Sequence, residues 1–138
     1  MPLYICSSAA GAIEASEKAR IAADITRIHC EVTDAPAKFV HAVFFEEEPR
    51  FPLNGATACV YGSIRAGRTD EQKSSIADAI RQSIEAHAGI SRDDAMAVIV
   101  DTPASWVMEG GEIMPEPGEE AAWLAAQEAK HGAGSATT

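Results

Sequence analysis

Short apolar runs alternate along the chain with longer segments in which apolar residues recur every three or four positions. The short runs are rich in β-branched and aromatic residues, which are typical of strands. This alternation predicts a mixed α/β fold. The four predicted strands span residues 3–8, 39–45, 58–64 and 95–100.

The two longer segments have the periodicity of amphipathic helices. The first begins near Ser16 and ends at 34–36, where Asp-Ala-Pro stops a helix. The second opens at Thr69, which with Gln72 fits a capping box, and closes at Gly89. The predicted apolar stripes are Ile21, Ile25, Ile28 and Val32 in the first helix, and Ile76, Ile80 and Ile84 in the second.

The two halves of the chain resemble each other. Residues 21–25 and 40–43 align with residues 76–80 and 95–98, 55 residues further on in both cases. We therefore predict a duplicated β-α-β unit whose crossover helices make the strands of each unit parallel and lie on one face of a four-stranded sheet. Because the second and fourth strands are apolar nearly throughout, we expect another subunit to cover the other face.

This pattern also sets expected boundaries. Residues 1–118 form one predicted domain, with repeat one at about 2–48 and repeat two at about 57–103, joined by a loop at 50–57. Residues 119–138 form a C-terminal extension, with a short helix over 119–130 and a frayed end. Four large residues between the domain core and the extension are expected to pack across the sheet or onto a neighbour: Trp106, Val107, Met108 and Ile113.

Composition excludes several classes of function. A chain of 138 residues with net charge −10 and only 11 lysines and arginines has no basic stripe for nucleic acid or an anionic membrane. Three cysteines without C-x-x-C spacing favour a reducing compartment and form no metal motif. No segment approaches the roughly 20 apolar residues of a membrane span. We expect a cytoplasmic protein that needs no cofactor or metal.

Two features carry candidate chemistry. Pro2 follows the initiator directly, so removal of Met1 would leave a secondary amine, able to act as an acid or base, beside a strand. Arg65 and Arg68 lie in the turn before the second helix, where strand ends and helix N-termini bind anions. Arginine recognises carboxylates through two parallel hydrogen bonds. Alternatively, the two arginines only offset an acidic surface.

Together these residues resemble the tautomerase superfamily, whose members use an N-terminal proline, and most of all its cis-3-chloroacrylic acid dehalogenase family. The likeness covers most of residues 2–118. It rests on Pro2, the segment 67–73, His29 late in the first helix, Arg65 with Arg68, Pro103-Ala104, Glu109, and Pro115-x-Pro117-Gly118.

The resemblance implies a role for each matching residue. Pro2 matches the catalytic amine, and Glu109 matches the carboxylate that activates water. Arg65, Arg68 and His29 match the residues that bind the substrate carboxylate. The resemblance also implies a homotrimer and a small carboxylate substrate.

One position departs from the family pattern. The dehalogenases pair their glutamate with a tyrosine, and the register set by Pro103-Ala104 puts Val98 there. Valine can neither orient a water molecule nor accept its proton. The sequence therefore favours a tautomerase acting on a 2-oxo acid or enol acid such as phenylenolpyruvate, with weak cis-3-haloacrylate dehalogenase or hydratase activity.

Two alternatives remain from the sequence alone. The chain is a hydratase or dehalogenase specialised for an unknown unsaturated carboxylic acid, or it is a non-catalytic ferredoxin-like module that binds small molecules. In the second alternative the same order of elements would form an antiparallel sheet.

Overall fold

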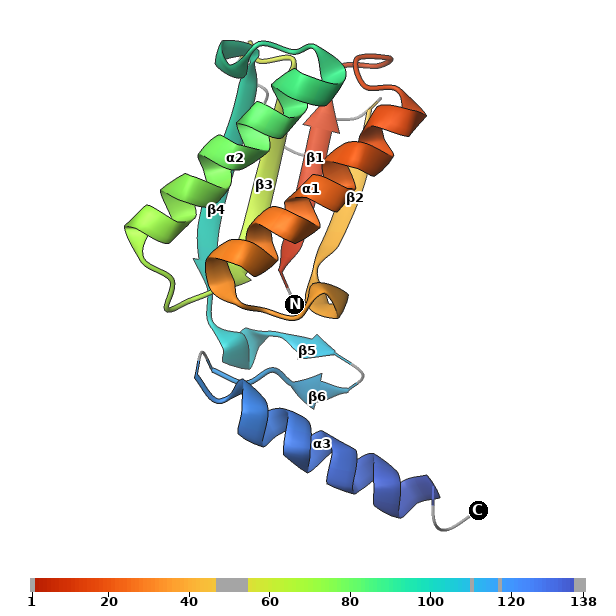
Figure 1. Cartoon of the computed structure of the whole chain (residues 1–138), viewed down its shortest axis with the longest axis vertical. Helices are drawn as coiled ribbons and strands as arrows, with labels where there is room; N and C mark the ends of the chain where they lie inside the picture. Colours follow the sequence, from red (N-terminus) through yellow and green to blue (C-terminus); the bar gives the residue numbers. More distant parts are fainter. Residues whose placement is uncertain (1, 47–54, 110, 117, 136–138) are drawn as a thin grey trace.

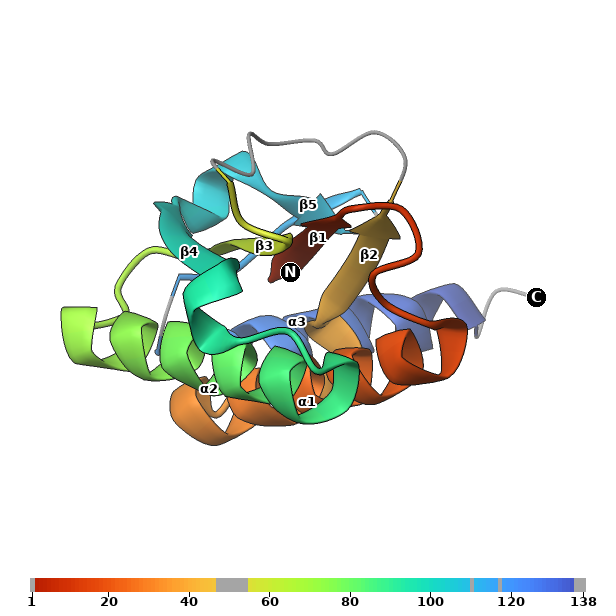
Figure 2. The ribbon, with the colours of Figure 1, turned by 90° about the horizontal axis from the view of Figure 1, so that it is seen from above.

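The fold is built on a four-stranded sheet with two long helices on one face (Figures 1 and 2). The computed structural model describes residues 2–46, 55–109, 111–116 and 118–135. The strands are β1 (Leu3–Ser8), β2 (His41–Phe45), β3 (Ala58–Arg65) and β4 (Ala95–Thr102), in the order β2-β1-β3-β4. The helices α1 (Ala15–Thr33) and α2 (Asp70–Ala88) each connect the two strands of one unit.

Strand directions confirm the duplicated β-α-β plan. β1 pairs with β2 and β3 with β4 in parallel, whereas the central pair β1–β3 is antiparallel. The antiparallel sheet expected of a ferredoxin-like module is therefore wrong for this chain. The antiparallel centre places the start of β1 beside the end of β3.

The predicted isoleucine stripes form the core between the helices and the sheet. All six isoleucines of the two stripes are at most 4% exposed, and Val32 packs against them. Both helices also have defined ends. Thr69 accepts a hydrogen bond from the Gln72 amide and Gln72 caps the Thr69 amide, which confirms the capping box. Gly89 ends α2 with φ of 69°, a left-handed conformation that glycine adopts at little cost.

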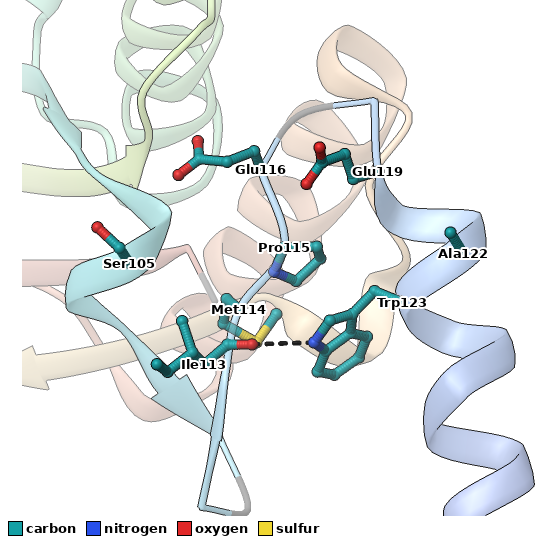
Figure 3. Close-up of a pocket in the computed structure, with 8 residues that line it drawn as sticks. All are labelled: Ser105, Ile113, Met114, Pro115, Glu116, Glu119, Ala122 and Trp123. Atoms are coloured by element: carbon teal, nitrogen blue, oxygen red, sulfur yellow. Dashed lines mark hydrogen bonds between the residues drawn. The ribbon is translucent and has the colours of Figure 1, made fainter.

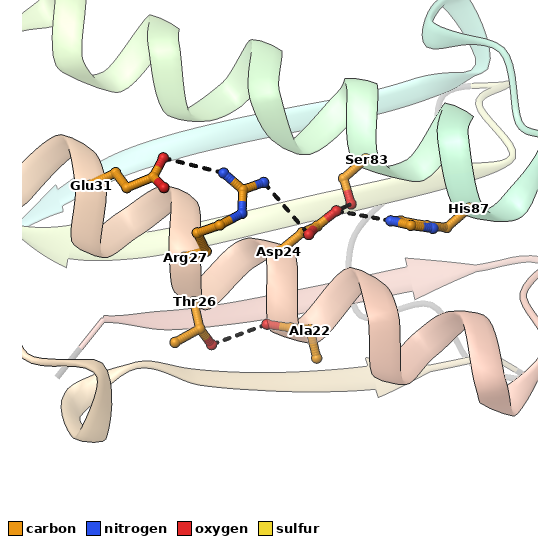
Figure 4. A network of polar contacts seen from close by, with 7 residues as sticks. All are labelled: Ala22, Asp24, Thr26, Arg27, Glu31, Ser83 and His87. Carbon is orange, nitrogen blue, oxygen red and sulfur yellow. Dashed lines mark hydrogen bonds and ion pairs between the residues drawn. The ribbon is translucent and has the colours of Figure 1, made fainter.

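A polar network joins the two helices on their outer side (Figure 4). One carboxylate oxygen of Asp24 on α1 lies 2.8 Å from the Ser83 hydroxyl and 2.9 Å from Nε2 of His87, both on α2. Arg27 bridges Asp24 and Glu31 along α1. These contacts join the middle of α1 to the C-terminal part of α2, and at the end that faces the start of β1 the Gln72 side chain donates to the Val32 carbonyl at 3.1 Å.

The segment after β4 forms a hairpin and a third helix. The hairpin strands are β5 (Met108–Glu109) and β6 (Glu112–Ile113), and α3 covers Glu120–Ser135. Figure 1 shows the hairpin and α3 beyond the end of the sheet where β1 begins. Phe39 and Met114 form a small second core there, packed against Val107, Trp123 and Leu124.

Two predicted boundaries were wrong. The second strand begins at His41, because Ala37–Phe39 form a 3-10 turn after Pro36 that directs Phe39 into the second core. The C-terminal helix continues past Lys130 to Ser135, and Lys130 forms an ion pair with Glu112 of the hairpin. Most of the predicted loop at 50–57 lies outside the described residues, as do Met1 and the last three residues. The domain boundary at residue 118 stays a prediction.

The face of the sheet opposite the helices is open in the single chain. Leu3, Val43 and Val98 on the strands are each more than a third exposed. Trp106, Met108 and Ile113 are 77%, 65% and 53% exposed, so they do not pack across the sheet of their own chain. Packing of these side chains onto a neighbour stays a prediction. No helix within the described ranges is long and apolar enough to cross a membrane.

Candidate functional site

The predicted site residues come from segments that meet at one end of the sheet. Leu3 is paired with Ser63, so Pro2 lies level with the last residues of β3, where Arg65 is found. Pro2 is buried, and its carbonyl accepts a hydrogen bond of 2.9 Å from the His41 amide. The same end of the molecule holds the end of α1, with His29, and the turn before α2, with Arg68 (Figure 1).

His29 is held by Tyr4 inside the core. The Tyr4 hydroxyl lies 2.8 Å from Nδ1 of His29, and the two rings meet edge to face with centroids 5.8 Å apart. Tyr4 is fully buried and His29 is 2% exposed. Gly62 lies opposite Tyr4 on β3, where an added Cβ would sit 2.6 Å from the tyrosine ring. The absence of a side chain at Gly62 thus makes room for the ring that orients His29.

Electrostatics keep His29 neutral. Burial lowers the pKa of His29 to about 4, helped by the positive charges of Arg68, the amino terminus and Arg65. Burial and the nearby Cys30 raise the pKa of Tyr4, so Tyr4 keeps its proton. A fully buried hydroxyl needs an acceptor, and His29 Nδ1 is within reach. We therefore assign Tyr4 as the donor, which places the histidine proton on Nε2.

Arg68 supplies a half-buried positive charge at a cavity. It lines a cavity of about 490 Å³ together with Thr33 and Asp34 at the end of α1 and Glu120 at the start of α3. Among the described residues, its Nε is the one buried side-chain nitrogen or oxygen without a hydrogen-bond partner. Burial lowers the pKa of Arg68, as does Arg65, and the carboxylates of Glu120 and Asp34 oppose that shift. An arginine is nevertheless always charged in proteins.

Arg65 is engaged by the C-terminal segment. Its side chain is 5% exposed, Nη1 donates to the Pro115 carbonyl at 2.6 Å, and Nη2 donates to Oε1 of Glu120 at 2.8 Å. Burial raises the pKa of Glu120, but bonds from its own amide, Arg65 and the Gly118 amide outweigh burial and lower it overall. The predicted arginine pair therefore consists of one partnered guanidinium and one with a free buried nitrogen.

Glu109 and Val98 have backbone positions that bear on their predicted roles. Glu109 lies on β5, opposite Glu112. Val98 lies on β4 opposite Tyr61 and is 38% exposed on the open face of the sheet. Tyr4 cannot take the place of the missing tyrosine, because its hydroxyl is bound to His29.

A second, larger cavity contains none of the predicted site residues. It has a volume of about 570 Å³ and lies between the hairpin and α3 (Figure 3). Its walls include Ile113, Met114 and Trp123, and the Trp123 indole donates to the Ile113 carbonyl at 2.9 Å. Because the charged residues in its wall, Glu116 and Glu119, are both acidic, this cavity is a weaker candidate for binding a carboxylate.

Residues 1–128 match the family Tautomerase_3, described as "Putative oxalocrotonate tautomerase enzyme". The chain belongs to the tautomerase superfamily. No curated protein matches the sequence.

Solved structures of other proteins are similar to this fold. N1, a member of the cis-3-chloroacrylic acid dehalogenase family, is 26% identical, with a TM-score of 0.79 over 89% of this chain and 90% of that chain. Native Ps01740 is 36% identical, with a TM-score of 0.70 over 78% of this chain and 99% of that chain. Macrophage migration inhibitory factor of Toxoplasma gondii, 16% identical with a TM-score of 0.65 over 80% and 96% of the two chains, shares the fold.

Within this tautomerase fold, sequence reasoning missed two residues. Tyr4 is two positions after Pro2, and strand alternation would have placed it on the same face as the buried Cys6. Glu120 follows the Pro-x-Pro-Gly segment by two positions and begins an alanine-rich helix, where acidic residues are common for helix stability alone. Only the fold shows that Glu120 meets Arg65, 55 positions earlier in the chain.

Proposed function

We propose that this tautomerase-superfamily chain is an enzyme that uses Pro2, once Met1 has been removed, to tautomerise a small 2-oxo acid or enol acid such as phenylenolpyruvate. The proposal rests on one observation. Pro2, the neutral His29 and the half-buried Arg68 lie on segments that meet at one end of the sheet. An amine, a neutral donor and a guanidinium are the groups that this reaction requires.

Each group has a defined part in the reaction. The neutral Pro2 amine takes the proton from the enol hydroxyl and returns it to the neighbouring carbon, which yields the 2-oxo acid. Arg68 binds the substrate carboxylate, and the Nε2–H of His29 donates to the carboxylate or to the developing enolate. Such donors lower the barrier because they are already oriented toward the charge that forms.

A weaker hydration activity follows from the likeness to a cis-3-chloroacrylic acid dehalogenase family member. Water activated by Glu109 adds to C3 of a 3-haloacrylate, and protonated Pro2 delivers a proton to C2. The resulting halohydrin loses hydrogen halide and becomes a 3-oxo acid. Because Val98 stands where those dehalogenases have a tyrosine, we expect this reaction to be slow.

We also propose that the chain acts as a homotrimer. The open sheet face with Leu3, Val43 and Val98, and the exposed Trp106 and Met108, provide apolar area for subunit contacts. Two fused 4-OT structures with this fold are described as trimers, one symmetric and one asymmetric.

Two measurements test the proposal: the intact mass of the native protein and its rate of phenylenolpyruvate turnover. The intact mass of the native protein should correspond to a chain without Met1. One 3-halopropiolate molecule should add covalently to each chain, at Pro2. Pro2→Ala should lower phenylenolpyruvate turnover at least about 100-fold while leaving the fold intact, since proton transfer by a positioned group contributes about that much. Retained Met1 or wild-type rates in Pro2→Ala would reject the proposal. Relative turnover of phenylenolpyruvate, 3-haloacrylates and acetylenic acids separates a tautomerase from a specialised hydratase.

A further inference from the structure

The C-terminal helix places a carboxylate inside the predicted substrate-binding cavity. Glu120 is the first residue of α3, and it lines the cavity that also contains Arg68. One oxygen of Glu120 bonds to Arg65 at 2.8 Å, and the other accepts from the Gly118 amide at 2.8 Å. Both oxygens are therefore held in place, and the carboxylate is a fixed part of the cavity wall.

As a result, the two arginines differ in whether their side chains are free to bind a ligand. Arg65 is 5% exposed, and its terminal nitrogens are bonded to Pro115 and Glu120, so it offers no terminal nitrogen to a ligand without breaking these contacts. Arg68, in contrast, lines the cavity and is only half-buried. An anion that enters the cavity therefore meets the guanidinium of Arg68 and not that of Arg65.

The charges around the cavity then limit what it accepts. Glu120 is bonded to Arg65, which leaves the charge of Arg68 for a ligand, and Asp34 adds a second carboxylate to the cavity wall. A ligand with one carboxylate can bind Arg68. A ligand with a second carboxylate close to the first brings another negative charge. No second cation is available to bind this charge, and Glu120 and Asp34 repel it.

We infer that Glu120 is a specificity-determining residue that occupies Arg65 and thereby restricts the site to monocarboxylates. This inference rests on the proposed function, because it identifies the same cavity as the substrate site. It assigns Arg65 the role of a positioning residue that anchors the start of α3, and it assigns carboxylate binding to Arg68. Removing the charge of Glu120 frees Arg65 to bind a second carboxylate.

Direct binding of two matched ligands tests the inference without using turnover. Fumarate and its monomethyl ester have nearly the same shape and differ by one charge at neutral pH. Calorimetry or NMR titration at pH 7.5 should show that the wild-type protein binds the monoester more tightly. In Glu120→Gln the ratio of the two dissociation constants should shift about tenfold toward fumarate.

Two controls separate this role from simple anchoring of α3. Glu119→Gln removes the neighbouring exposed charge and should leave the ratio unchanged. Glu120→Asp keeps a carboxylate and should keep the wild-type preference. Equal weakening of both ligands in Glu120→Gln would mean that Glu120 only anchors the helix, and would overturn the inference.

The wild-type protein alone can also reject the inference. Tighter binding of fumarate than of the monoester, or no binding of either ligand, would overturn it even if Glu120→Gln failed to fold. If the binding ratios behave as expected but phenylenolpyruvate is not converted, the proposed function fails and the charge restriction stands. If phenylenolpyruvate is converted but the binding ratios of wild type and Glu120→Gln do not differ, the charge restriction fails and the proposed function stands.

Discussion

The Tyr4 hydroxyl and Nδ1 of His29, 25 residues apart in the chain, are joined by a buried hydrogen bond of 2.8 Å. Tyr4→Phe removes the donor and leaves Nδ1 without this partner in the core. We expect the free energy of unfolding to fall by about 1–2 kcal/mol. Denaturant unfolding measures the loss. In a His29→Asn background the same change should cost less, and an equal cost in both backgrounds would show that the two residues are not coupled.

The pKa of His29 predicts a specific loss of stability in acid. In the unfolded chain His29 titrates near 6.5, and in the folded protein near 4, so below pH 6.5 only the unfolded state gains the proton. Stability should fall as the pH drops from about 6.5 to 4, by on the order of 3 kcal/mol, and this contribution should level off below pH 4.

The measurement compares unfolding free energies across this pH range in wild-type protein and His29→Asn. The variant should lack this part of the pH dependence. His41→Gln, which changes an exposed histidine, should follow the wild-type curve. Parallel curves for wild type and His29→Asn would show that His29 titrates alike in both states.

Arg68→Ala should weaken substrate binding more than it alters folding. The side chain lines the cavity and its Nε has no hydrogen-bond partner, so its loss removes a guanidinium from the proposed site without breaking a hydrogen bond of that nitrogen. We expect kcat/KM for phenylenolpyruvate to fall at least about 100-fold, the size of a lost charge-assisted contact. Arg20→Ala, an exposed arginine paired with Glu17 on α1, is the control and should keep wild-type kinetics.

Val98→Tyr should increase dehalogenation. The substitution restores the hydroxyl that the family resemblance implies at this position, and Val98 is 38% exposed in the single chain, so the change does not overpack the core of the subunit. We expect turnover of cis-3-chloroacrylate to rise at least about tenfold. Val98→Phe adds the same ring without the hydroxyl and should give no gain. Equal rates in the two variants would mean that ring size, and not proton transfer, determines the effect.

The open sheet face predicts that a charge placed there disrupts assembly. Val43 is 41% exposed on β2, so Val43→Glu should be tolerated in the single chain but not within a subunit contact. Sedimentation velocity should give a trimer for the wild-type protein and a smaller species for the variant. Ala86→Glu adds the same charge to the exposed surface of α2 and should remain trimeric.

The sequence predicted the fold because each local signal agreed with the others. The isoleucine stripes, the capping box at Thr69 and the spacing of 55 residues between repeats all required the same β-α-β units, and the parallel pairings confirm them. The wrong start of the second strand has a tertiary cause. Phe39 has strand propensity, but contact with Met114, far along the chain, directs it into the second core.

The site was predictable only in part, because contacts between distant segments do not leave a local pattern. Pro2, Arg65 and Arg68 were candidates from their positions in the sequence and His29 through family resemblance, and the fold places the backbones of all four at one end of the sheet. The pairing of Arg65 with Glu120 depends on how α3 crosses that end, which no periodicity in the sequence encodes. The roles of these residues stay predictions.

The spacing of 55 residues places Thr57 in repeat two where repeat one has Pro2. The nitrogen of Thr57 is a peptide amide that donates to the Asp94 carbonyl at 2.8 Å, so it has no lone pair to exchange a proton. Two separate β-α-β chains would have two terminal amines, whereas their fusion retains one. The two halves of the near-symmetric sheet therefore differ in chemistry: once Met1 is removed, each chain of the proposed assembly would have one proline amine, at the start of β1.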